Sequence, residues 1–137
     1  MTGFKLPGSR ALGPGAVRLW RREPWWAEFW SGLTAIGWGG ACVAANGVWP
    51  SMAVLAQLGG QGFWEAVGLG LGFLQLALLL ADTRWLRWAG AAVMAWFWGV
   101  LTLGVWAAVP GAPGVAIYAG WCGINLYSSV RLLRPNG

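Results

Sequence analysis

The chain has 137 residues and a formal net charge of +5; 58% of its residues are hydrophobic and only 9% are charged. Because soluble domains have about 25% charged residues, this composition excludes a soluble fold, which could not cover its surface with so few charges. There is no histidine, and Lys5 is the only lysine. These absences exclude haem ligation by histidine, the commonest zinc sites, most catalytic triads and an intramembrane Schiff base. We therefore expect a membrane protein that is not an enzyme and has no cofactor.

Residues 1–24 are expected to form a flexible basic arm. Prolines, glycines and scattered arginines interrupt the arm, and it lacks the apolar core of a cleavable signal peptide. Pro24 stands where a helix can begin, and Trp25, Trp26 and Trp30 follow as an aromatic girdle at a membrane boundary. We predict a transmembrane domain over residues 25–134. Its first span, at about 29–49, has roughly the 20 residues that the hydrocarbon core of a bilayer requires.

The connection at residues 50–62 is only weakly polar. Its apolar residues recur with helical spacing, and Gly59 and Gly60 follow them. This pattern predicts a short amphipathic helix on the outer membrane surface that ends at the two glycines; a re-entrant segment is the alternative. The second span is predicted at about 63–81, and Asp82, Thr83 and Arg84 form the turn that ends it.

Two further spans follow this turn. The third is predicted at about 88–109 and the fourth at about 115–130, with residues 135–137 as a short tail. The uncharged Pro-Gly-Ala-Pro-Gly sequence at 110–114 is typical of a tight loop between them.

Every basic residue lies in the N-terminal arm, in the turn after the second span or at the C-terminus. The positive-inside rule assigns all three clusters to the cytoplasm, so an even number of crossings separates each cluster from the next. The fold class that we predict is therefore an all-α membrane protein with four transmembrane helices in two hairpins and both termini cytoplasmic. The residues expected to set this topology are Arg18, Arg21, Arg22, Arg84, Arg87, Arg131 and Arg134.

The positive charge does not indicate nucleic acid. The basic residues flank apolar spans, where they meet anionic lipid headgroups. No basic helix face or aromatic–basic ribonucleoprotein motif accompanies them. We expect the lipid bilayer as a partner and no nucleic acid. The excess of arginine over lysine is typical of a GC-rich bacterial or phage genome, so the expected location is the bacterial inner membrane.

Two polar stripes, each with three- and four-residue spacing, run along the second and fourth spans. They consist of Glu65, Gly68, Gly72 and Gln75 on the second span, and of Tyr118, Cys122, Asn125 and Ser129 on the fourth. Each stripe is either a helix-packing seam or the lining of a pore or substrate path. Gly68 and Gly72 form a small-xxx-small motif, which favours the seam. Asn125 needs a partner inside the bilayer, and Gln75 is the one expected.

Glu28 and Glu65 are the acids nearest the predicted spans. Glu28 falls among the girdle tryptophans and Glu65 falls near the outer boundary, so we expect interfacial acids on opposite sides of the bilayer. This separation excludes a shared acid–base site. Cys42 and Cys122 fall inside spans and are expected to pack as small apolar groups.

Most of the 13 tryptophans fall near predicted membrane boundaries, but Trp38, Trp96 and Trp98 fall in the middle of spans. Their N–H groups need acceptors within the protein, or their rings must stack on neighbouring helices. Bulky tryptophans packed against small residues are the main expectation, and binding of a chromophore or lipid is the alternative.

Four short helices with a glutamate in the first resemble the small multidrug resistance transporters in size and topology, which implies transport through Glu28 or Glu65. The short length, basic tail and lack of motifs resemble the holins, which implies an oligomeric pore. Our main hypothesis is a small membrane protein that acts by helix–helix assembly with itself, as a holin-like or effector-like pore. The alternatives are a structural or accessory subunit of a larger membrane complex, and a transporter like the small multidrug resistance proteins.

Overall fold

The computed structural model describes residues 23–45, 49–81 and 83–133, and all regular elements within these ranges are helical. The long helices are α2 (Glu23–Ala44), α4 (Gln61–Ala81), α5 (Arg84–Ala108) and α6 (Pro113–Leu133). A short 3-10 turn, η1 (Pro50–Met52), and a short helix, α3 (Ala53–Gln57), lie between α2 and α4. The long helices match the predicted ones in number and order. The predictions for the basic arm up to residue 22, for Arg18, Arg21, Arg22 and Arg134, and for the tail at 135–137 concern residues outside the described ranges.

The first long helix begins beside Pro24, where the sequence allows a helix to begin, and it ends before Trp49. The predicted span covers 29–49, whereas α2 covers Glu23–Ala44. Pro24 lies in the first turn of α2, where its missing N–H group costs no hydrogen bond and its fixed φ suits a helix. The tryptophan girdle is therefore part of the helix and does not precede it.

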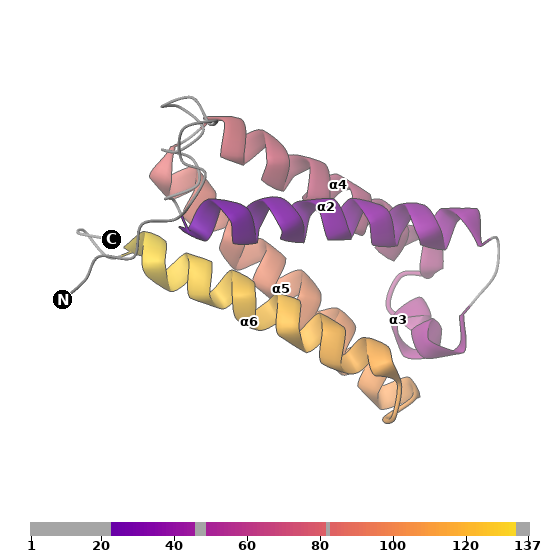
Figure 1. The fold of residues 1–137 in the computed structure, drawn as a ribbon. Helices are drawn as coiled ribbons and strands as arrows, with labels where there is room; N and C mark the ends of the chain where they lie inside the picture. The colour runs from indigo at the N-terminus through magenta and orange to yellow at the C-terminus, as the bar shows by residue number, and fades with distance from the viewer. Residues whose placement is uncertain (1–22, 46–48, 82, 134–137) are drawn as a thin grey trace, which may run out of the picture.

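The long helices run alternately in opposite directions and form two hairpins, α2 with α4 and α5 with α6 (Figure 1). The start of α2, the end of α4, the start of α5 and the end of α6 consequently meet at one end of the bundle. We call this the basic end, because it carries Arg84, Arg87 and Arg131. The opposite end, which holds α3 and the α5–α6 connection, is called the loop end. This is the order predicted for two hairpins.

The short helix α3 lies between the two hairpins at the loop end (Figure 1). Met52 and Leu55 are 2% and 1% exposed, and Leu55 lies so close to Gly104 of α5 that no Cβ atom would fit there. Trp64 Nε1 donates a hydrogen bond to the carbonyl oxygen of Leu55 at 2.8 Å. Gly60, with φ +80°, supplies the left-handed backbone that leads into α4. The predicted short helix before the two glycines is confirmed, but its buried face packs on α4 and α5.

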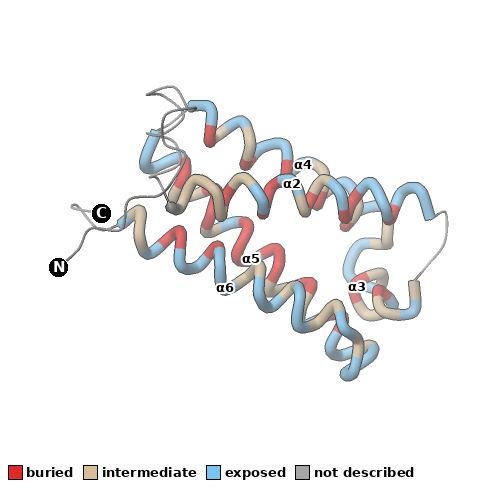
Figure 2. Tube along the Cα trace, in the orientation of Figure 1, coloured by how far each residue is buried: buried red, intermediate tan, exposed pale blue. Residues whose placement is uncertain are grey.

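Each long helix has a buried stripe that faces the bundle and an exposed stripe that faces outward (Figure 2). The exposed stripes carry large apolar side chains such as Leu80, Leu103 and Trp96, which are 86%, 66% and 58% exposed. Polar and charged side chains are found in the buried stripes: Glu28, Ser31, Gln75, Arg87, Asn125, Ser128 and Ser129. Soluble proteins rarely bury charged residues and rarely expose large apolar side chains in contiguous patches, so this exterior suits an apolar surrounding.

Two of the helices, α4 and α5, are long and apolar enough to cross a membrane. Only 28% and 44% of their most apolar stretches are buried, whereas an apolar core helix of a soluble protein is mostly buried. The helices α2 and α6 have 22 and 21 residues, which is also a sufficient length. Glycines and tryptophans lower the hydropathy of α2, and glycines and polar residues lower that of α6. These two helices are compatible with the membrane protein expected from the composition.

Candidate functional site

An ion pair joins the two hairpins near the basic end. Glu28 in α2 and Arg87 in the first turn of α5 are 1% and 6% exposed. Arg87 Nε donates to Glu28 Oε2 at 2.9 Å, and Arg87 Nη2 donates to Glu28 Oε1 at 3.1 Å, so the two planar groups meet as forks. A single charge in this interior would be costly, and the forked pairing gives each charge the partner that it needs.

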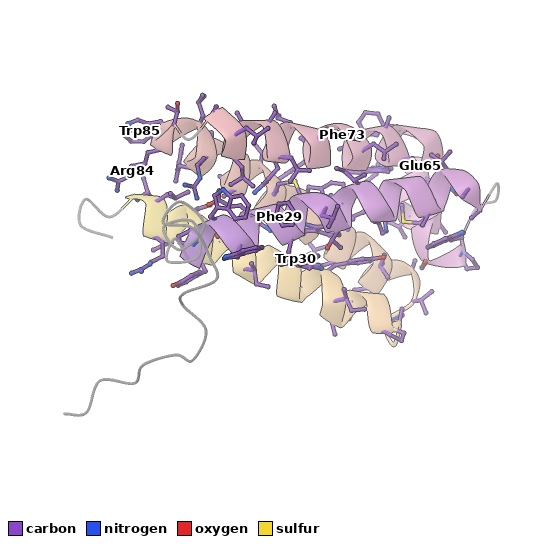
Figure 3. The ribbon with its side chains drawn as sticks, turned by 45° about the horizontal axis from the view of Figure 1, so that its top comes forward. Phe29, Trp30, Glu65, Phe73, Arg84 and Trp85 are labelled. Atoms are coloured by element: carbon purple, nitrogen blue, oxygen red, sulfur yellow. The ribbon has the colours of Figure 1, made fainter. Side chains whose placement is uncertain are left out.

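This arrangement corrects the expected environment of Glu28. The sequence predicts an interfacial acid among the girdle tryptophans. The carboxylate turns inward instead and pairs with Arg87, while Trp30 is 51% exposed and Trp25 stacks on Phe29 with ring centroids 5.3 Å apart. Figure 3 shows Phe29 and Trp30 along α2. Helical periodicity thus places the Glu28 carboxylate and the exposed ring of Trp30 on different faces of the same two turns of α2.

Arg87 is thus a buried partner of Glu28 as well as a member of the basic clusters. Arg84, in contrast, is exposed at the basic end beside Trp85 (Figure 3). The Nε atom of Arg84 donates to the carbonyl oxygen of Leu132 in the last turn of α6. A cation is favourable there, because the carbonyl groups at a helix C-terminus carry partial negative charge.

Ser31 lies one turn after Glu28 on α2 and connects α2 with α5 and α6 near the ion pair. The Ser31 hydroxyl accepts a hydrogen bond from Trp98 Nε1 of α5 at 3.1 Å and another from Asn125 Nδ2 of α6 at 2.7 Å. Asn125 Nδ2 also donates to the carbonyl oxygen of Trp121 at 2.8 Å. Ser31, Trp98 and Asn125 are each fully buried. We call Glu28, Ser31, Arg87, Trp98 and Asn125 the polar network.

The expected pairing of Asn125 with Gln75 is wrong. Asn125 bonds Ser31, and Gln75 Oε1 has no hydrogen-bond partner within the described ranges. The reason is the helix order, because α4 packs mainly on α2 whereas α6 packs mainly on α5. Gln75 and Asn125 therefore belong to different hairpins and to different faces of the bundle.

The tryptophans in the middle of the helices divide into two kinds. Trp38 Nε1 donates to the hydroxyl oxygen of Tyr118 at 3.0 Å, and Trp98 stacks on Tyr118 with ring centroids 5.7 Å apart. The prediction that central tryptophans need internal acceptors is confirmed for Trp38 and Trp98. Trp96 points outward instead, at 58% exposed, and belongs to the apolar exterior.

The glycines of α4 form a close contact with α2, as their spacing predicts. A Cβ atom added to Gly72 would lie 2.7 Å from the carbonyl oxygen of Gly32, and one added to Gly68 would lie 2.9 Å from the ring of Trp38. Gly39 of α2 approaches the backbone of α4 in the same way, because its Cβ would lie 3.0 Å from the carbonyl oxygen of Glu65. The glycine face of α4 is therefore a packing seam inside one hairpin.

Glu65 lies at the loop end, opposite Arg84 and Trp85 (Figure 3). Its carboxylate is half-buried and accepts a hydrogen bond from Gln61 Nε2 one turn earlier, at 2.6 Å. Glu28 and Glu65 are near opposite ends of the bundle, so they do not form one acid–base site.

The polar stripe of α6 also faces inward. Asn125 and Ser129 are buried and Tyr118 is half-buried. The Ser129 hydroxyl donates to the carbonyl oxygen of Asn125 at 2.9 Å. In the isolated protomer, neither polar stripe forms a water-lined surface along its whole length, because both are covered by neighbouring helices.

Sequence reasoning missed Ser31 and Ser128, which are both fully buried. Glu28 and Ser31 are three residues apart on α2, and this spacing is a signal for one polar face that could have identified Ser31. Across the described part of the chain, no group of three His, Cys, Asp or Glu side chains could hold a metal ion. Cys42 is buried and Cys122 is half-buried, and both are free thiols.

The polar network can hold helices in register and can exchange hydrogen bonds, but it presents no nucleophile paired with a base. The network is therefore a structural centre that three helices share. In the comparisons with known proteins, no family model, curated protein or solved structure matches the chain.

Proposed function

We propose that the chain is an integral membrane protein with four crossings and cytoplasmic termini, and that it acts by helix–helix association within the bilayer rather than by catalysis. The partners in this proposal are further copies of the chain or other membrane subunits. The observation that carries it is the reversed distribution of side chains, with Glu28, Arg87 and Asn125 buried and large apolar side chains outside. An aqueous surrounding would penalise that exterior.

The lengths of the helices support four crossings. The shortest of the long helices has 21 residues, and at a rise of about 1.5 Å per residue such a helix covers the roughly 30 Å of a hydrocarbon core. The basic end would then face the cytoplasm. We propose the inner membrane of a bacterium as the location, because the excess of arginine over lysine is typical of GC-rich bacterial or phage genomes.

The outer surfaces of the helices supply candidate association faces. Gly37, Gly40, Gly70, Gly120 and Gly123 are exposed, and a Cβ atom at any of them would meet nothing within 4 Å. Small residues on a lipid-facing surface let another helix approach closely. This supports a structural or accessory subunit more directly than a pore, because the polar side chains that would line water are used inside the protomer.

A holin-like or effector-like pore is the second proposal. It requires a water path between protomers or a separation of the two hairpins, since the α4 seam and the α6 stripe both pack internally. Transport in the manner of the small multidrug resistance proteins is the third. It is favoured by the buried carboxylate of Glu28, although Arg87 already neutralises that charge.

The oligomeric state of the full chain in lipid nanodiscs, combined with dye release from vesicles, tests the proposal. We expect defined oligomers, or stable complexes with other membrane subunits, without release of a small dye. A symmetric ring that releases dye would favour the pore. A monomer that associates with nothing in its native membrane would contradict the association itself.

Cysteine labelling separates a seam from a water path. In a chain with Cys42 and Cys122 replaced by alanine, Gln75→Cys should not react with a small charged thiol reagent, because Gln75 is 3% exposed and faces α2. Glu65→Cys, at the half-buried end of the same stripe, is the matched control and should react. Rapid reaction at position 75 in the native assembly would support the pore.

A further inference from the structure

Two buried polar atoms of α6 have no hydrogen-bond partner in the part of the chain that the structure describes. They are Asn125 Oδ1 and Ser128 Oγ, and both residues are 0% exposed. The two residues are three positions apart, so they share one face of the helix. An unpartnered buried polar atom is costly, and the cost is greatest where no bulk water can reach it. The two neighbouring atoms therefore indicate a shared partner.

The helix register places this pair of atoms near the level of the Glu28–Arg87 ion pair along the bundle. Asn125 bonds Ser31 directly, and α2 and α6 run in opposite directions (Figure 1). Three residues from Ser31 toward the basic end lead to Glu28, and three residues from Asn125 toward the same end lead to Ser128. Ser128 consequently lies at the level of Glu28.

The neighbouring serine shows how Ser128 differs from an ordinary helical serine. The Ser129 hydroxyl donates to the carbonyl oxygen four residues earlier, which is the usual way to satisfy a serine inside a helix. Thr102 of α5 does the same with the carbonyl oxygen of Trp98. The hydroxyl of Ser128 makes no such bond, so it is available to a group outside its own helix.

We propose that the basic half of the bundle binds internal water between Asn125 Oδ1 and Ser128 Oγ, next to the Glu28–Arg87 pair. The ligand must donate a hydrogen bond to Asn125 Oδ1, which can only accept, and must donate to or accept from the Ser128 hydroxyl. The ligand must also be neutral. The charges of Glu28 and Arg87 cancel each other, and an added charge of either sign would be repelled by one of the two. Water meets all three conditions, and buried waters typically make about three such bonds.

This water site goes beyond the proposed association and does not depend on it, because every residue involved belongs to one protomer. Its role would be to complete the polar network where α2, α5 and α6 meet. It would also connect the ion pair to the Ser31, Asn125 and Trp98 hydrogen bonds.

Thermal unfolding of two adjacent serine variants, each in the full chain in nanodiscs, gives the first test. Ser128→Ala removes one partner of the water and should lower the unfolding midpoint by several degrees more than Ser129→Ala, which removes only a local bond to the helix backbone. A rise in the midpoint for Ser128→Ala would show a dry, unsatisfied hydroxyl and would overturn the proposal. Equal shifts in the two variants would show that Ser128 bonds its own helix, and would overturn it as well.

Radiolytic hydroxyl labelling in ¹⁸O water gives the second test, with the wild-type chain. Phe97 and Trp98 are adjacent, aromatic and both 0% exposed, but only Trp98 belongs to the polar network. With each rate normalised to the unfolded chain, we expect labelling of Trp98 and protection of Phe97, with slow uptake of ¹⁸O at Trp98. Protection of both rings, or equal labelling of both, would contradict a localised water. The proposal requires both experiments to give the expected result.

Discussion

Glu28 and Arg87 are the buried charged side chains of the described ranges, and they come from different hairpins. Removing two charges from water carries a desolvation penalty that offsets most of the favourable energy of their attraction. Such a pair therefore contributes little net stability compared with apolar residues of similar size. Its effect is on specificity, because the charges are tolerated only when the hairpins dock in this register. The forked geometry makes the register strict, since two hydrogen bonds must form together.

We predict that removing one partner is far more damaging than removing both. Glu28→Ala should lower the unfolding free energy by about 3–5 kcal/mol, because the guanidinium of Arg87 is left buried without its carboxylate. The double variant Glu28→Met with Arg87→Met should be close to the wild type. Unfolding in mixed detergent micelles measures these free energies, with Glu65→Gln as the half-buried control. If the double variant lost as much as Glu28→Met and Arg87→Met lose together as single variants, the two side chains would be acting independently.

At the scale of the helices, the α2–α4 hairpin is held by backbone contact. Glycines stand on both sides of the seam, and a Cβ atom on Gly72 would lie 2.7 Å from a carbonyl oxygen and 3.0 Å from the backbone nitrogen of Ile36. Such separations leave room only for hydrogen atoms. In an apolar solvent, packing of this kind drives helix association, because burial of apolar surface gives no advantage over contact with lipid.

We predict that Gly72→Leu forces α2 and α4 apart and lowers the unfolding free energy of the protomer by about 1–3 kcal/mol or more, the usual cost of overpacking. Gly70→Leu is the matched control, because Gly70 lies two residues away on the exposed face with nothing within 4 Å. The control should leave the protomer stable, although it changes a candidate association face. Both variants are compared by detergent unfolding and by oligomer size. Equal stability of the two variants would contradict the seam.

The seam was predictable from sequence, because Gly68, Gly72 and Gln75 recur at local helical spacing. The burial of Glu28 was not, because it depends on Arg87, 59 residues away, and on which face α5 presents to α2. The same is true of Asn125, whose partner Ser31 is 94 residues away. Periodicity identifies a face that must be buried, but the helix that covers it is decided by how the hairpins dock. The start of α2 was predictable for a local reason, because Pro24 suits the first turn of a helix.

At the scale of the whole molecule, the charges at the basic end define an orientation. The described cations Arg84, Arg87 and Arg131 lie at that end, and no Lys or Arg occurs between residues 23 and 83. The loop end contains Gly59, Gly60 and the α5–α6 connection, which are uncharged. If the bundle spans a membrane as we propose, the positive-inside rule places the basic end on the cytoplasmic side.

We predict that reporter fusions at Gly59 and Gly111 report an external location, while fusions at Thr83 and Gly137 report a cytoplasmic one. All nine basic residues would then be on one side of the membrane. A periplasmic phosphatase and a cytoplasmic fluorescent protein, fused at the same four sites, provide complementary readouts. An external signal at Thr83 would contradict both the two-hairpin topology and the orientation.

The ion pair also has a consequence for biogenesis. The chain is made from the N-terminus, so in the proposed four-span topology α2 with Glu28 would enter the membrane ahead of α5 with Arg87. Ser31 would gain Trp98 and Asn125 later still. The contacts to α2 span 59, 67 and 94 residues of sequence, so they close in that order as α5 and then α6 arrive. In that topology, the position of Glu28 near the basic end would keep its carboxylate hydrated at the lipid headgroups until Arg87 arrives. In the proposed topology, a chain arrested after α4 would leave the Glu28 carboxylate without Arg87 and the Ser31 hydroxyl without Trp98 and Asn125, so an unfinished molecule would differ from a finished one at this centre.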